Sequence, residues 1–209
     1  LRSGEVATFD YYRQLLRLIY RLLFLFVAED RNLLHPRGAG DGERRRYARY
    51  YSLSHIRTLA GRRRGGPHHD LWRSLTVVFD GLGKPDGVPE LGLPALGSFL
   101  WSPAACPDLD PSQIAKQHLM AAVRQLGFVE DRDEKVLRPV DYRNLGTEEL
   151  GAIYESLLEQ HPDVNADAGT FRLKADGDSA DVTFDLPVES DVPRPGVALP
   201  ADGGEPGAA

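Results

Sequence analysis

The sequence predicts a mainly α-helical protein with little β-structure. Apolar residues recur at helical spacing in several separate segments, and residues that favour helix starts or stops flank them. The hydrophobic fraction of 42% is enough for a packed core. We expect a multi-helix domain over residues 1–164, a short β-hairpin over residues 165–186, and a disordered acidic tail, rich in proline and glycine, over residues 187–209.

Residues 10–30 are expected to form the first helix, which is apolar on nearly every face, as is typical of the central helix of a bundle. The most apolar run in it, residues 22–28, has seven residues, whereas a membrane span needs about 20. Glu29, Asp30 and Arg31 follow that run, where a signal peptide would need a small-residue cleavage site. We therefore expect neither a membrane span nor a signal peptide.

A second helix, basic and aromatic, is expected over residues 44–59, and the glycines and proline of residues 61–67 end it. The third helix is expected to begin at Asp70, a favourable N-cap, and to continue as an amphipathic stripe to Leu82. Residues 83–107 are rich in glycine and proline, and regularly placed apolar residues predict that this loop is ordered. Those residues are Leu91, Leu93, Leu96, Phe99 and Trp101.

The next helix is expected to begin at residues 110–113, where an aspartate cap precedes a proline and a glutamine. Gly127 is expected to end it. Residues 129–135 are expected to form a charged connector. Residues 136–142 are expected to be extended, because Pro139 is unfavourable inside a helix.

Thr147 is expected to cap the last helix, which Pro162 closes. Glu148 and Glu149 lie in its first turn, where carboxylates interact favourably with the helix dipole. After Asp167, apolar residues on both sides of an Asp-Gly-Asp turn predict a marginal hairpin. The expected facing residues are Phe171 and Leu173 on one strand and Val182, Phe184 and Leu186 on the other.

Charge is unevenly distributed along the chain. The net charge is −6, and residues 165–209, with three basic and nine acidic residues, account for all of it. Residues 31–73 contain 11 arginines and three acidic residues, which gives +8. The single cysteine, Cys106, excludes an internal disulfide and favours a reducing, cytoplasmic setting.

The basic segment predicts contact with nucleic acid. Arginines interleaved with tyrosines suit binding to phosphates together with stacking on bases or sugars. A solvated helix face followed by an arginine-rich loop is the alternative interpretation. The candidate contact residues are Arg44, Arg45, Arg46, Arg49, Arg62, Arg63, Arg64, Tyr47 and Tyr50.

Three other patterns favour structural roles. Residues 77–83 resemble a strand that enters a cofactor-binding glycine loop, but the helical spacing of the preceding residues argues against a strand. Asp108 with residues 133–135 has the composition of a metal-dependent nuclease site, but neither part lies on an expected strand. His68 and His69 lack the regular spacing of metal ligands. We expect no catalytic, cofactor-binding or metal-binding residue in this chain.

Three blocks together resemble the region just upstream of the methylase domain in large bacterial DNA adenine methyltransferases of restriction–modification and phage-defence systems. These include the single-chain type II enzymes and the PglX-like methylases of BREX systems, and the resemblance covers about residues 1–173. The blocks are LRSGEVATFDYYRQLLRLIYRLLFLFVAEDR, LWRSLTVVFDGLGKPDGVPELGLPALGSFLW and RPVDYRNLGTEELGAIYESLLEQHP.

This resemblance implies a helical connector that positions an S-adenosylmethionine-dependent domain acting on N6 of adenine. The family's Asn-Pro-Pro-Tyr motif is absent, because none of the three asparagines precedes a proline. With Leu1 at its start and Met120 as its only methionine, the chain is expected to be a fragment whose partners are DNA and the missing methylase domain. Candidate docking residues for that domain are Tyr142, Arg143, Asn144, Glu148 and Glu149.

A stand-alone protein-interaction module is the alternative function. Its acidic end would mimic DNA or cover the basic segment, since −6 neutralises much of +8 at low salt. Deletion of residues 175–209, followed by DNA titration at several salt concentrations, would separate the two functions.

Overall fold

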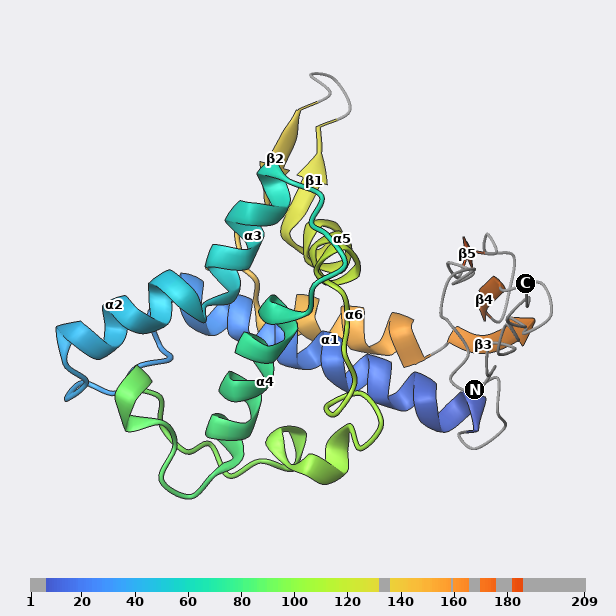
Figure 1. Ribbon diagram of the computed structural model, residues 1–209. Helices are drawn as coiled ribbons and strands as arrows, with labels where there is room; N and C mark the ends of the chain where they lie inside the picture. Colours follow the sequence, from blue (N-terminus) through green and yellow to red (C-terminus); the bar gives the residue numbers. More distant parts are fainter. Residues whose placement is uncertain (1–6, 132–135, 159, 166–169, 176–181, 186–209) are drawn as a thin grey trace, which may run out of the picture.

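The computed structural model describes residues 7–131, 136–158, 160–165, 170–175 and 182–185 (Figure 1). The protein is mainly helical, as the sequence predicts. The helices are α1 (Thr8–Asp30), α2 (Asp41–Tyr50), α3 (Leu53–Arg62), α4 (Asp70–Gly83), α5 (Lys116–Gly127) and α6 (Thr147–Leu158). Three short 3₁₀ turns, η1 (Pro89–Leu91), η2 (Phe99–Trp101) and η3 (Pro103–Ala105), lie in the connection between α4 and α5. No helix in the described ranges is long and apolar enough to cross a membrane.

Helix α1 is central, as its apolar residues predict. It extends along the domain while α3 and α4 cross it, and α5 lies beside α3 (Figure 1). Leu25 and Phe26 of α1 are fully buried together with Trp72 and Leu75 of α4 and Val123 of α5. One apolar cluster therefore joins helices from distant parts of the sequence.

The basic helix expected over residues 44–59 is two helices. Helix α2 ends at Tyr50, and Ser52 begins α3 by accepting a hydrogen bond on Oγ from the His55 amide at 3.1 Å. The Glu29 carboxylate of α1 accepts hydrogen bonds from the amides of Leu53 and Ser54, both at 2.8 Å. These acceptors satisfy the free amides at the start of α3, which explains the break in the expected helix.

One expected helix start is wrong, and one helix begins at the expected residue but without the expected cap. Helix α5 begins at Lys116 instead of residues 110–113, because the Asp110 carboxylate accepts a hydrogen bond from Arg21 Nη1 at 2.6 Å. Asp70 is the first residue of α4 and not its cap, and it forms an ion pair with Lys116 at 2.9 Å. In both cases a cation from elsewhere in the chain binds the carboxylate that was expected to cap the helix.

Polar contacts from α1 hold the long α4–α5 connection. Arg21, fully buried, also donates to the Leu100 carbonyl at 2.7 Å, and Arg17 donates to the Ala105 carbonyl at 2.7 Å. Gln14 donates to Asp108 at 2.6 Å and accepts from the Asp108 amide at 2.9 Å. The connection is therefore ordered as expected. Of its predicted anchors, Leu91, Leu93 and Trp101 are buried, whereas Leu96 and Phe99 are exposed.

Two small antiparallel sheets complete the fold. Strands β1 (Phe128–Glu130) and β2 (Leu137–Pro139) form a hairpin that projects from the top of the view in Figure 1, so the connector expected over residues 129–135 begins as a strand. Strands β3 (Gln160–Asn165), β4 (Thr170–Ala175) and β5 (Val182–Asp185) form the second sheet.

Strands β4 and β5 lie where the sequence predicts the C-terminal hairpin. Phe171 pairs with Phe184, and Leu173 pairs with Val182. Helix α6 begins at Thr147 as expected, but it ends at Leu158, and Pro162 lies within the additional strand β3. The tail expected over residues 187–209 lies outside the described residues.

Candidate nucleic-acid interface

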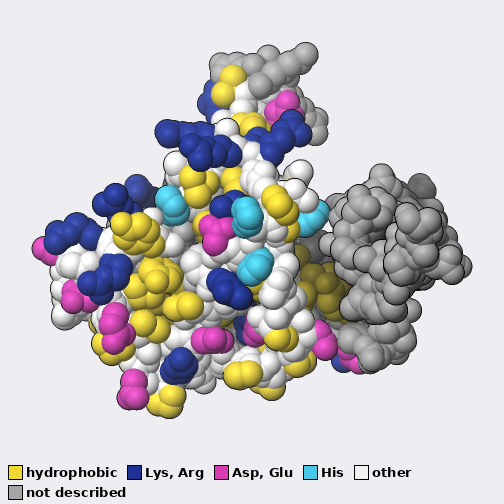
Figure 2. Space-filling model, in the orientation of Figure 1, with side chains coloured by type: hydrophobic (Ala, Val, Ile, Leu, Met, Phe, Trp, Pro, Cys, Tyr) yellow, Lys and Arg dark blue, Asp and Glu magenta, His cyan; other side chains and the backbone are white. Residues whose placement is uncertain are grey.

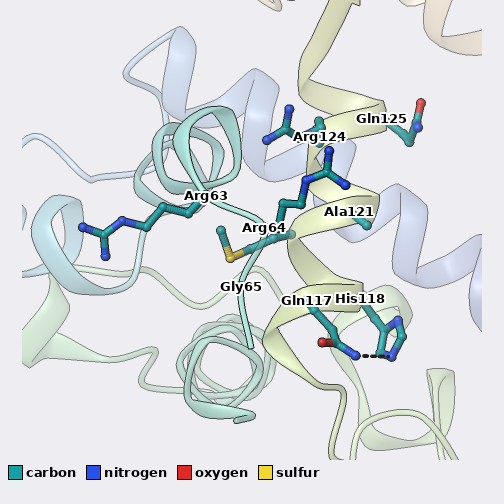
Figure 3. A pocket seen from close by; sticks show the side chains of 9 residues that line it. Arg63, Arg64, Gly65, Gln117, His118, Ala121, Arg124 and Gln125 are labelled. Atoms are coloured by element: carbon teal, nitrogen blue, oxygen red, sulfur yellow. Dashed lines mark hydrogen bonds between the residues drawn. The ribbon is translucent and has the colours of Figure 1, made fainter. Parts of the chain in front are cut away.

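The arginine triplet, defined as Arg62, Arg63 and Arg64, lies at the end of α3 and the start of the α3–α4 loop, and all three side chains are exposed. Beside it lies a hollow of about 470 Å³ against α5, here called the α5 hollow. Figure 3 shows Arg64 extending along α5 toward Arg124, whereas Arg63 extends away from α5. The lining residues are Arg63, Arg64, Gly65, Gln117, His118, Met120, Ala121, Arg124 and Gln125.

Backbone contacts place the loop on α5. The Lys116 amide donates to the His68 carbonyl at 2.6 Å, and the Gln117 amide donates to the Gly66 carbonyl at 3.1 Å. Gly65 has φ of 85°, and a Cβ there would lie 2.9 Å from the Gln117 backbone, so this position requires glycine. The loop therefore follows the first turn of α5 with no room for a side chain between them.

The α5 hollow is positively charged. No carboxylate lines it, and in the described part of the chain no ion pair or hydrogen bond engages the guanidinium groups of Arg63 and Arg64. Arg124 donates one Nη2 hydrogen bond to the Ala60 carbonyl, which fixes its position and leaves other donors free. Nearby Lys116 is already paired with Asp70, and its hydrogen bond is the main cause that lowers the pKa of that carboxyl. The hollow can therefore hold an anion such as phosphate.

The basic residues of α2 are divided between structural and solvent-facing roles. Arg44 donates to the carbonyls of Ala39 and Pro36 at 3.1 and 2.9 Å, and Arg46 donates to the Glu90 carbonyl at 2.5 Å. Arg45 and Arg49 are exposed on the same helix. Figure 2 shows Lys and Arg side chains gathered over α2 and around the upper end of α3.

Tyr47, expected to contact nucleic acid, lies in the core instead. Its side chain is 2% exposed, and its hydroxyl donates to the Glu29 carboxylate at 2.6 Å. Burial, followed by the charge of Glu29 and this hydrogen bond, raises the pKa of Tyr47 well above its usual value. Tyr50, one turn later, is 55% exposed, so only the second tyrosine lies on the surface.

A second hollow, of about 530 Å³, lies between α2 and α4 and is here called the α2–α4 hollow. Its lining residues are Arg46, Tyr50, Tyr51, Arg73, Ser74 and Val77. Sequence reasoning did not select Arg73, Gln117, His118 or Arg124. Arg73 is one of the 11 arginines already counted in the +8 segment, whereas nothing in the sequence around Arg124 distinguishes it from a solvated helical residue.

The candidate docking residues do not all lie on the surface. Tyr142 is buried, its ring stacks on Phe26 with centroids 4.8 Å apart, and its hydroxyl donates to the Leu126 carbonyl at 2.8 Å. It is therefore a core residue, contrary to its expected role. Arg143 is exposed but donates to the Asp30 carbonyl at 2.9 Å.

The remaining docking candidates are exposed. Asn144 donates to the Asp141 carboxylate at 2.9 Å, within its own turn. Glu148 and Glu149 face solvent in the first turn of α6. Of the five candidates, these three and Arg143 remain available to a partner.

The other sequence patterns have structural explanations. Residues 77–83 belong to α4, so the strand required for a cofactor loop does not form there. Asp108 is bonded to Gln14, while its proposed partners at residues 133–135 lie outside the described residues. The described residues contain no cluster of three potential metal ligands. Cys106 is fully buried, and this burial is the main cause that raises its pKa to about 11.

Comparisons with protein-family models, curated proteins and solved structures gave no match to this chain.

Proposed function

We propose that the helical domain binds DNA backbone phosphates at the α5 hollow, as a non-catalytic connector of a site-specific DNA adenine-N6 methyltransferase. The observation that carries the phosphate-binding proposal is the convergence of Arg64 and Arg124 on a hollow with no carboxylate in its lining. Arg63, which has no ion pair with a described residue, adds a further positive charge beside it. Guanidinium groups bind phosphate oxygens with paired hydrogen bonds, and such contacts position a protein on DNA without reading its sequence.

The link to a methyltransferase rests on the resemblance of the three sequence blocks. In this proposal the parent protein supplies the S-adenosylmethionine site and the catalytic motif, acts in a bacterial cytoplasm, and docks on the exposed start of α6. This chain would set the position of DNA relative to the methylase domain.

The phosphate-binding proposal is tested by measuring duplex DNA binding against salt concentration for two single-charge variants. Arg64→Ala removes a charge at the hollow, whereas Arg13→Ala removes one from the surface of α1, where Arg13 is half-exposed and 3.8 Å from Asp10. We expect Arg64→Ala to reduce the slope of log affinity against log salt by about one and Arg13→Ala to leave it unchanged. Equal slopes for both variants would contradict the proposal.

The alternative, an interaction module with a masking acidic tail, needs a separate experiment. Replacing Glu189, Asp191, Asp202 and Glu205 by their amides keeps the chain length and removes four negative charges. Salt-dependent DNA binding that appears only in this variant would indicate a masked DNA surface. Absence of binding in both forms would favour a purely structural role.

A further inference from the structure

The α2–α4 hollow differs from the α5 hollow in having an apolar wall. Tyr50 and Val77, which line it, are 55% and 44% exposed. Figure 2 shows hydrophobic side chains beside the basic ones in the region of α2. A site for phosphate alone would gain nothing from this apolar surface.

The end of α2 produces this exposure. Tyr47 faces the core and is fixed by Glu29, so Tyr50, the last residue of the helix, lies beyond the packed turn. The guanidinium carbon of Arg49 lies 5.3 Å from the centroid of the Tyr50 ring. Because Arg49 lies over one face of the ring, the other face is the stacking platform for a planar π-system.

Two further arginines flank the platform. Arg46 is held by the Glu90 carbonyl, and Arg73 is exposed on α4 without an ion pair to any described residue. Ser74 lines the same hollow, and none of the described carboxylates does. The hollow thus combines an aromatic platform with cations at its edge.

We propose that the α2–α4 hollow binds one unpaired nucleobase of DNA, stacked on Tyr50, with the adjoining phosphate on Arg73. This inference rests on the proposed DNA binding at the α5 hollow and extends it from duplex phosphates to an unstacked nucleotide. Bases inside a duplex are stacked on their neighbours and cannot occupy the platform. Single-stranded or locally opened DNA exposes the face that the ring needs.

The test uses the full chain and two oligonucleotides of equal length and charge. One is a fluorescent single strand of thymidines, and the other is the same strand built from abasic sites, which keeps every phosphate but has no bases. We expect the thymidine strand to bind about tenfold more tightly to the unsubstituted protein, because one base stacked on Tyr50 contributes to binding. Equal affinity for both strands would overturn the inference.

Paired substitutions of Tyr50 locate the effect. Tyr50→Leu keeps an apolar side chain but removes the ring, so we expect it to abolish the preference for the thymidine strand. Tyr50→Phe keeps the ring and should retain the preference. An unchanged preference in Tyr50→Leu would also overturn the inference, because the bases would then bind elsewhere.

Duplex DNA measured in parallel separates this inference from the proposed function. Duplex binding that depends on Arg64, without any preference between the two single strands, would remove the nucleobase site and leave the phosphate site intact. Failure of the duplex to bind, together with equal affinity for the strands, would remove both.

Discussion

Arg21 of α1 and Arg64 after α3 present the same guanidinium group in opposite environments. The Arg21 side chain is 1% exposed, and its donors are bonded to Asp110 and to the carbonyls of Leu100 and Ser102. Arg64 is exposed and engages no described carboxylate. The density of arginine in a sequence therefore does not identify a binding surface, since satisfied donors belong to the fold and unsatisfied ones are available to a ligand.

The largest effect is expected from Arg21→Ala. This substitution leaves Asp110 half-buried without its partner and two backbone carbonyls without a donor, so we expect a loss of about 3–5 kcal/mol in the free energy of unfolding, measured in urea. Arg13→Ala, which removes an exposed ion pair, should cost less than about 0.5 kcal/mol. Similar losses for the two variants would show that the buried contacts do not hold the α4–α5 connection.

The second prediction concerns the thiol of Cys106, which α1 and the α4–α5 connection bury. Because burial raises its pKa to about 11, roughly one thiol in a thousand is ionised at pH 8, compared with about a quarter for an accessible cysteine. We expect alkylation of the folded protein to be at least about a hundredfold slower than in urea, and to accelerate as pH rises.

The raised pKa of Cys106 predicts how the stability of the fold changes with pH. The folded chain holds the thiol proton more tightly than the unfolded chain does. The stabilising contribution is therefore present below a pH of about 8.5 and is lost as pH rises toward about 11. Stability that increases over this range would contradict burial of the thiol.

A smaller effect distinguishes the two tyrosines of α2. Tyr47→Phe removes a hydrogen bond to the Glu29 carboxylate, and we expect a loss of about 2 kcal/mol in the free energy of unfolding. Tyr50→Phe removes an exposed hydroxyl and should change stability by less than about 0.5 kcal/mol. Equal losses of unfolding free energy in urea would contradict the assignment of Tyr47 to the core and Tyr50 to the surface.

The smallest effect on stability is expected from Arg63→Ala combined with Arg64→Ala. Neither guanidinium group has a described partner, so the free energy of unfolding should stay within about 0.5 kcal/mol of the unsubstituted value. A larger loss would assign the arginine triplet to the fold and weaken the case for a binding site.

Local patterns predicted much of the fold. The apolar stripes located α1 and α4, Gly127 marked the end of α5, and alternation gave the pairing of β4 with β5. The errors arose where a residue distant in the sequence makes the hydrogen bond that a local residue was expected to make. The Asp110 carboxylate accepts a hydrogen bond from Arg21, 89 positions away, and the Glu29 carboxylate accepts one from the Leu53 amide at the start of α3.

The candidate site was predicted less completely, for the same physical reason. Charge density located the arginine triplet, but no local signal placed Arg124 beside it or directed Tyr47 into the core. Sequence spacing shows which residues share a helix face, but it does not show which of two tyrosines will meet a carboxylate from another helix.

The first turn of α5 depends on the loop that follows the arginine triplet. Its N-cap, Ala115, has no side chain that can accept a hydrogen bond, and the carbonyls of Gly66 and His68 serve instead. This turn and the loop after the arginine triplet must therefore form and open as one cooperative unit. The hydrogen-exchange rates of the Lys116 and Gln117 amides would then report detachment of the basic loop, even though both residues belong to another helix.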